Sequence, residues 1–124
     1  FLTLLIASLI AKRFAEQQPP YTADVLSTTY RIPIRLTSQI LFQLKRLGII
    51  NEVNYGGDER VIHYQPAMDI HQLTVSYLLD KMDREGSEDF KIDTARLFSP
   101  EWKALLKTRE DMMRAGEHIL LKDL

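Results

Sequence analysis

The stretch RIPIRLTSQILFQLKRLGII, residues 31–50, carries the start and stop signals of a helix with a regular apolar pattern between them. Pro33 has a preset backbone angle that suits the first turn of a helix, and Gly48 readily takes the left-handed conformation that ends one. Apolar side chains recur between them at the spacing of one helical face: Leu36, Ile40, Leu41, Leu44 and Leu47. We therefore expect a helix over residues 33–47 with one face packed in a core.

Two further helices are predicted upstream. Residues 1–15 are largely apolar at helical spacing, and the proline pair of EQQPP, residues 16–20, ends this helix. Its apolar run is roughly half of what a membrane span needs, so we expect a buried core helix and no membrane crossing by this stretch. Thr22 can cap a second helix over about residues 22–30, which the segment RIP ends.

A β-hairpin is predicted after the 33–47 helix. The segments IINEVNY and RVIHYQ are rich in β-branched and aromatic residues, and GGDE between them can supply the positive backbone angles of a hairpin turn. These segments form a wing over residues 49–65. Three helices followed by a wing within residues 1–66 predict a winged helix-turn-helix domain, in which the third helix commonly lies in the DNA major groove. The expected fold class is mainly α with a small β-hairpin.

Residues 67–124 are predicted to add a helical extension of two or three helices. Asp69 and Gln72 have the spacing of a capping box, so a helix is expected from there to the segment DREGSED. A single turn is expected at 93–98, and SPEW at 99–102 is a strong start for the last helix. The extension either packs on the winged-helix domain or forms a dimer arm, because its apolar stripes allow both arrangements.

The charge balance limits the partners that the chain can attract. The 124 residues carry 16 basic and 17 acidic side chains, and the net charge is −1. Residues 1–64 have seven basic and five acidic side chains, net +2, while residues 65–124 have nine and twelve, net −3. No general cationic field therefore draws the molecule to phosphate, and any contact with nucleic acid would be local and weak. Without cysteine, the chain forms no disulfide and no thiolate site.

Two groups of side chains are candidates for binding a partner. The polar residues expected on the outward face of the 33–47 helix and on the wing are candidates for nucleic-acid contact, with a solvated surface as the alternative: Arg31, Arg35, Ser38, Gln39, Gln43, Arg46 and Arg60. Acidic residues on the wing, Glu52, Asp58 and Glu59, would be repelled by phosphate. Apolar residues expected on exposed faces are candidates for protein contact: Ile34, Phe42, Trp102, Met112 and Met113.

No pattern in the chain predicts catalysis. His63, His71 and His118 are far apart, and none has a second histidine at metal-binding spacing. The chain has no phosphate loop, no dinucleotide-binding glycine motif and no nucleophile elbow. We expect a protein that is not an enzyme and that needs no cofactor or metal.

The winged-helix half resembles regulators of the IscR type. The resemblance rests on framework positions of the stretch quoted above: Ile32, Pro33, Ile40, Leu41, Leu44 and Gly48. It implies a dimeric transcriptional regulator that binds DNA. The chain lacks the cysteines that hold the iron-sulfur cluster of such regulators, and it has Ile34, Phe42 and Gln43 where they often have charged residues.

A second resemblance covers nearly the whole chain. The segments PPYTADVLSTTYRIPIRL, YQPAMDIHQLTVSYLLDKMDREGSEDFKID and EWKALL are similar to the soluble C-terminal extension of the YihY (BrkB) membrane-protein family, long labelled ribonuclease BN. This resemblance implies a cytoplasmic domain tethered to the inner membrane behind a multi-span core. The opening on Phe1 and the cations Lys12 and Arg13 agree with that placement. No motif in the chain supports the ribonuclease activity that this label names.

The leading hypothesis from the sequence is therefore a non-catalytic interaction or regulatory module of a YihY-type membrane protein. Its partner would be another protein or its own membrane core. The alternative hypothesis is a dimeric winged-helix regulator that binds DNA through the outward face of the 33–47 helix.

Overall fold

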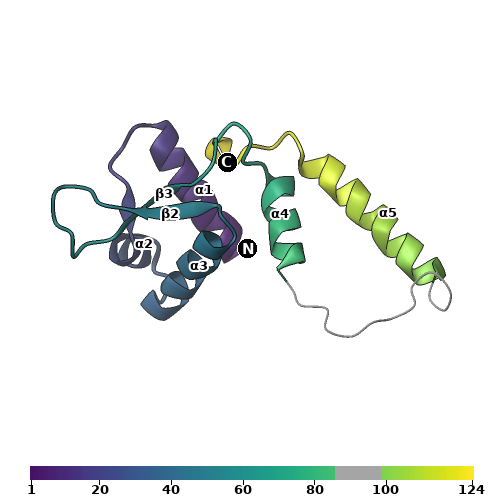
Figure 1. Cartoon of the computed structure of the whole chain (residues 1–124), viewed down its shortest axis with the longest axis horizontal. Coiled ribbons are helices and arrows are strands. Elements are labelled where there is room, and N and C mark those ends of the chain that lie inside the picture. Colours follow the sequence, from purple (N-terminus) through teal and green to yellow (C-terminus); the bar gives the residue numbers. More distant parts are fainter. Residues whose placement is uncertain (86–98) are drawn as a thin grey trace.

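The computed structural model describes residues 1–85 and 99–124, which form a helical unit with a small sheet and a projecting pair of helices (Figure 1). The turn expected at 93–98 lies outside the described residues. The elements in chain order are α1 (Leu2–Ala15), β1 (Tyr21–Thr22), α2 (Ala23–Tyr30), α3 (Ile34–Arg46), β2 (Ile50–Val53), β3 (His63–Pro66), α4 (Val75–Arg84), α5 (Ser99–Gly116) and the short 3-10 helix η1 (Leu121–Asp123). The predicted fold class, mainly α with a small β-hairpin, is confirmed, and β1 adds a third antiparallel strand to the hairpin.

The core lies where α1, α2, α3 and the sheet meet. The largest side chains that are fully buried there come from α1, α2, α3 and the start of β2: Ile6, Ile10, Leu26, Leu41, Leu44, Ile49 and Ile50. Each such side chain contributes about 1.5–3 kcal/mol when it leaves water. The apolar stripe of α1 is therefore a core face, as its spacing predicts, and η1 packs on the same helix through Leu121.

The turn between α2 and α3 is held by side-chain hydrogen bonds. The Thr22 hydroxyl accepts a bond from the Val25 N–H at 3.1 Å and caps α2, as predicted. Arg31 ends α2 in the left-handed conformation with φ +55°. The Ser27 hydroxyl then donates to the Ile32 carbonyl at 2.6 Å. Together these bonds set the angle at which α3 leaves the turn.

The helix α3 begins at Ile34, one residue later than predicted, so Pro33 precedes it. Pro33 has ψ 135°, which is not helical, and its carbonyl accepts the first helical bond from the Thr37 N–H at 2.9 Å. The Thr37 side chain, fully buried, also donates to this carbonyl at 3.1 Å. Proline therefore caps α3 and does not belong to its first turn, because its backbone is extended and only its carbonyl takes part in the helical bonding.

The sheet contains a strand that the sequence patterns do not reveal. Its order is β1-β3-β2, all antiparallel, with Tyr21 opposite Tyr64 and Glu52 also opposite Tyr64 on the other side. β1 has only two residues, too few for an alternating pattern to stand out. The connection from β2 to β3 spans residues 54–62 and is longer than the tight GGDE turn expected, although Gly56 and Gly57 do have positive φ angles.

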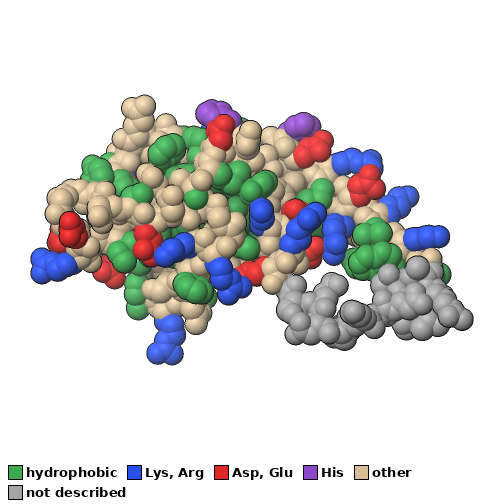
Figure 2. All heavy atoms as spheres, in the orientation of Figure 1, with side chains coloured by type: hydrophobic (Ala, Val, Ile, Leu, Met, Phe, Trp, Pro, Cys, Tyr) green, Lys and Arg blue, Asp and Glu red, His purple; other side chains and the backbone are tan. Residues whose placement is uncertain are grey.

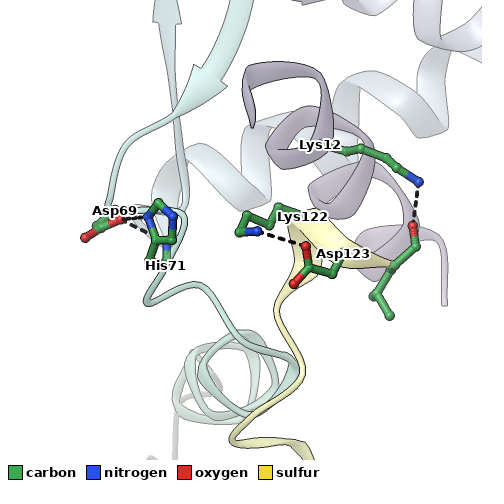
Figure 3. A network of polar contacts seen from close by, with 6 residues as sticks. Lys12, Asp69, His71, Lys122 and Asp123 are labelled. Carbon is green, nitrogen blue, oxygen red and sulfur yellow. Dashed lines mark hydrogen bonds and ion pairs between the residues drawn. The ribbon is translucent and has the colours of Figure 1, made fainter. Parts of the chain in front are cut away.

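The start of α4 differs from the prediction at Asp69. The Asp69 carboxylate accepts bonds from the backbone N–H of His71 at 2.9 Å and lies 3.0 Å from its ring Nδ1, so it stabilises a turn (Figure 3). These two bonds hold the pKa of Asp69 below its usual range. The helix begins only at Val75, where the Thr74 hydroxyl accepts a bond from the Tyr77 N–H.

The two long helices of the extension pack on each other. The Ser76 hydroxyl donates to the Met113 carbonyl, and a side chain at Gly116 would meet Ser76 Oγ at 2.8 Å. Asp83, near the end of α4, pairs with Arg109 of α5 at 3.0 Å. We call α4 and α5 together the arm. In Figure 1 the arm lies beside the winged-helix unit, with α5 on its outer side.

The base of the arm is tied to the winged-helix unit by the last residues of the chain. The Val75 N–H donates to the Ile119 carbonyl at 2.9 Å, and the Leu121 N–H donates to the Leu73 carbonyl at 3.0 Å. The Lys12 ammonium reaches the main-chain oxygen of Leu124 at 2.8 Å (Figure 3). The end of the extension thus packs on the winged-helix unit through η1 and α1, while its role as a dimer arm stays a prediction. The division into two domains at residue 66 stays a prediction.

Candidate nucleic-acid interface

The outward face of α3 lies opposite the buried residues of that helix. Arg35, Gln39, Phe42 and Arg46 are spaced by four, three and four residues, so they form one stripe along the helix. Phe42, in the middle of the stripe, is 64% exposed. Ile34 lies at the edge of the stripe and is 47% exposed. The α3 surface is therefore a mixed surface of cations, amides and exposed apolar groups.

The N-terminal half of this face presents its polar groups to solvent. Arg31, Arg35, Ser38 and Gln39 are all exposed. Within the ranges 1–85 and 99–124, no carboxylate forms an ion pair with either Arg31 or Arg35. The polar groups of these side chains are thus accessible from solvent.

The C-terminal half of the face is different, because neighbouring carboxylates hold its donors. Lys45 Nζ lies 3.2 Å from Glu52 Oε1 of β2. Gln43 Nε2 donates to Glu85 Oε2 at 3.0 Å, and Arg46 forms an ion pair with the other oxygen of the same carboxylate. Glu85 ends α4, and its side chain is only 18% exposed. The sequence patterns do not indicate this contact, since Glu85 lies about 40 residues from its partners.

The wing adds little positive charge. Arg60 Nε lies 3.3 Å from the Asp58 carboxylate, which also accepts the Arg60 backbone N–H at 3.0 Å. Glu59 beside them is exposed. On β3, burial and, second, the carboxylate of Glu52 raise the pKa of Tyr64. Figure 2 shows the result on one face of the molecule, where basic and acidic side chains are interspersed.

The structure therefore divides the seven predicted nucleic-acid contacts into three places. Arg35, Ser38 and Gln39 are exposed at the start of α3, and Arg31 is exposed in the turn before it. Gln43 and Arg46 face the end of α4, and Arg60 lies in the loop of the wing. Contact of any of them with nucleic acid stays a prediction.

The five candidates for protein contact lie on two separate elements. Ile34 and Phe42 belong to the exposed side of α3, whereas Trp102, Met112 and Met113 belong to α5. Met112 is exposed, as are Leu105 and Leu106 on the same helix. Trp102 and Met113 are partly buried. The exposed apolar side chains of α5 thus belong to a different element from the exposed apolar side chains of α3.

The described ranges bring together no group of three or more histidine or acidic side chains that could hold a metal ion. His71 pairs with Asp69, His118 lies beside Glu117, and His63 packs on Tyr55 with ring centres 5.4 Å apart. In the same ranges, every helix is too short or too polar to cross a membrane.

Comparison with known proteins identifies the fold. No protein-family model matches the chain, and no curated protein sequence does. Among solved structures, CymR, the global cysteine regulator of B. subtilis, matches with a TM-score of 0.64 at 15% identity, over 98% of this chain and 88% of that one. CymR of Staphylococcus aureus matches with a TM-score of 0.63 at 14% identity, over 97% and 88%. IscR of T. potens matches with a TM-score of 0.62 at 15% identity, over 94% and 75%.

These matches cover the arm as well as the winged-helix unit, so the chain has the fold of the CymR and IscR winged-helix regulators over nearly its whole length. They support the resemblance to IscR-type regulators at the level of fold. They give no support to the resemblance to the YihY family, which stays a hypothesis.

Proposed function

We propose that this protein is a dimeric winged-helix regulator that binds DNA and has no catalytic activity. The observation that carries the proposal is the exposed cluster of Arg31, Arg35, Ser38 and Gln39 at the start of α3. On a winged-helix fold, this part of the third helix enters the major groove. The fold is shared with proteins described as regulators, including the cysteine regulator CymR.

Each side chain in the cluster has a chemistry that suits DNA. Arginine can donate two bonds to guanine, and glutamine can bond to adenine, so Arg35 and Gln39 are proposed to contact base edges. Arg31 lies in the turn before α3, where a phosphate is the natural partner. The exposed ring of Phe42 can pack on the methyl group of thymine.

Charge explains why a dimer is proposed. The winged-helix half has a net charge of only +2, and two of the cations on α3, Lys45 and Arg46, are already paired. A dimer doubles the number of phosphate contacts and binds two half-sites about one helical turn of DNA apart. The exposed apolar side chains of α5 provide a surface on which a second copy can pack.

The test is a salt titration of binding to double-stranded genomic DNA fragments. We expect log affinity to fall linearly with log salt concentration, because each contacted phosphate releases counterions. Arg35→Ala should weaken binding, and Arg31→Ala should make the salt dependence shallower because a phosphate contact is lost. Arg114→Ala, which removes an exposed cation of α5 paired with Glu110, is the matched control and should leave binding unchanged. No binding at low salt would overturn the proposal.

The second candidate function is an interaction module on the cytoplasmic face of the inner membrane, as part of a YihY-type protein. Exposed Ile34 and Phe42 on α3, together with the paired cations beside them, favour contact with a protein partner or a membrane core. An antibody to this domain, used on membrane and soluble fractions of cells, tests this proposal. A band well above 14.4 kDa in the membrane fraction supports it, and a small soluble band overturns it.

A further inference from the structure

One carboxylate links the arm to the candidate reading helix. Glu85, at the end of α4, accepts a bond from Gln43 through one oxygen and forms an ion pair with Arg46 through the other. The three groups come from two elements that otherwise make few contacts. Among the described residues, Glu85 therefore connects the tip of α4 to the end of α3 through two polar contacts.

This carboxylate offers the same chemistry as a DNA phosphate. Both are anions whose oxygens accept bonds from guanidinium and amide groups. Glu85 is also better shielded from water than the other carboxylates paired with the interface. Its side chain is 18% exposed, compared with 40% for Glu52 and 46% for Asp58. The carboxylate of this pair is consequently less screened by water than the carboxylates of the other two pairs, while Arg46 itself is 59% exposed.

The position of Glu85 depends on the arm. The first residues of α4 are tied to the chain end through Val75 and Ile119, so this end of the helix is anchored. Glu85 lies at the opposite end, ten residues on, or about 15 Å along the helix axis. Asp83, two residues before it, is paired with Arg109 of α5. A tilt of α4 about its anchored end would move Glu85 most, and a shift of α5 would be transmitted to it through Asp83.

We propose that Glu85 competes with DNA phosphate for Gln43 and Arg46, so that the arm restrains DNA binding by α3. While Glu85 occupies these donors, only the N-terminal half of the α3 face is available to DNA. A displacement of the arm releases both donors and raises affinity. This inference rests on the proposed DNA-binding function and adds a mechanism by which an event at α5 would regulate it.

The test compares the affinity of full-length variants for genomic DNA fragments at low salt. Glu85→Gln should bind roughly 5- to 20-fold more tightly than wild type, the range of a modest coupling between sites. Glu85→Ala should change affinity in the same direction, and circular dichroism should show that both variants are folded. Asp58→Asn and Glu52→Gln remove one negative charge each from other pairs of the interface, and each should raise affinity by less than about threefold.

A mutant cycle separates competition from a general charge effect. In a Gln43→Ala/Arg46→Ala background, Glu85→Gln should give no more gain than Asp58→Asn does, because both donors that it releases are gone. Equal gains for Glu85→Gln and Asp58→Asn in the otherwise wild-type protein would overturn the competition while leaving DNA binding intact. A loss of affinity in Glu85→Gln would also overturn it, since Glu85 would then hold Arg46 in position for DNA. Absence of DNA binding in wild type and all variants would overturn the proposed function itself.

Discussion

The two halves of α3 carry similar polar side chains but have different surroundings. At its start, Arg35 and Gln39 face solvent, as does Arg31 in the turn before it, and the two arginines have no carboxylate partner among the described residues. At its end, Lys45 and Arg46 are held by carboxylates of β2 and α4. The difference shows that a cation on the outward face of a helix is a candidate for DNA contact only when no carboxylate of a neighbouring element forms an ion pair with it.

The largest expected effect concerns the core that supports both halves. Leu44 is fully buried on the inner face of α3, and Leu44→Ala should lower the free energy of unfolding by about 2–5 kcal/mol through lost burial and a cavity. Phe42→Ala, two residues away on the outward face, should change it by less than about 0.5 kcal/mol. Urea unfolding of both variants measures the contrast. Similar losses would mean that Phe42 is packed and is not available to a partner.

The most direct test of the difference between the two halves of α3 compares alanine substitutions of Arg35 and Arg46. Arg35→Ala should weaken DNA binding by about 5- to 150-fold, the cost of about 1–3 kcal/mol for losing a specific contact. Arg46→Ala should weaken it by less than about threefold, because Glu85 already holds that side chain in wild type. Binding isotherms at one fixed salt concentration suffice. Equal losses would remove the distinction between the two halves.

A change at the base of the arm should alter the packing of α4. The Cβ of alanine at Gly116 would lie 2.8 Å from Ser76 Oγ and 3.2 Å from Ser76 N, so Gly116→Ala should push α4 and α5 apart. We expect a loss of about 1–3 kcal/mol in the free energy of unfolding. Ala115→Ser changes an exposed neighbour by a similar volume and is the control. An unchanged midpoint for Gly116→Ala would show that the two helices are not in close contact.

The smallest expected effect is at the turn before α3. Arg31 adopts the left-handed conformation at φ +55°, which costs an ordinary residue about 1 kcal/mol relative to glycine. Arg31→Gly should therefore leave stability unchanged or raise it by up to about 1 kcal/mol, while DNA binding weakens because one phosphate contact is lost. Thermal unfolding and DNA titration on the same sample check both changes. Unaltered DNA affinity would remove Arg31 from the interface.

Much of the winged-helix architecture follows from local signals. The first three helices begin and end within one residue of the ranges expected from their caps, prolines and apolar spacing. The sequence patterns do not reveal β1, because its two residues form a strand only when β3 lies beside them. The start of α4 was placed too early because the Asp69 side chain bonds to His71 in a turn, a choice that the capping-box pattern cannot distinguish from a helix start.

The sequence by itself determines the order of the helices, the wing and the exposed stripe of α3, because each depends on interactions between residues a few positions apart. The sequence does not determine whether the charged side chains of this stripe are free to bind an external anion. Whether Arg35 or Arg46 can meet an anion depends on Glu52 and Glu85, which approach α3 only after β2 and α4 have packed. Electrostatic pairing acts through space between elements that are distant in the chain, so it becomes defined only in the folded structure.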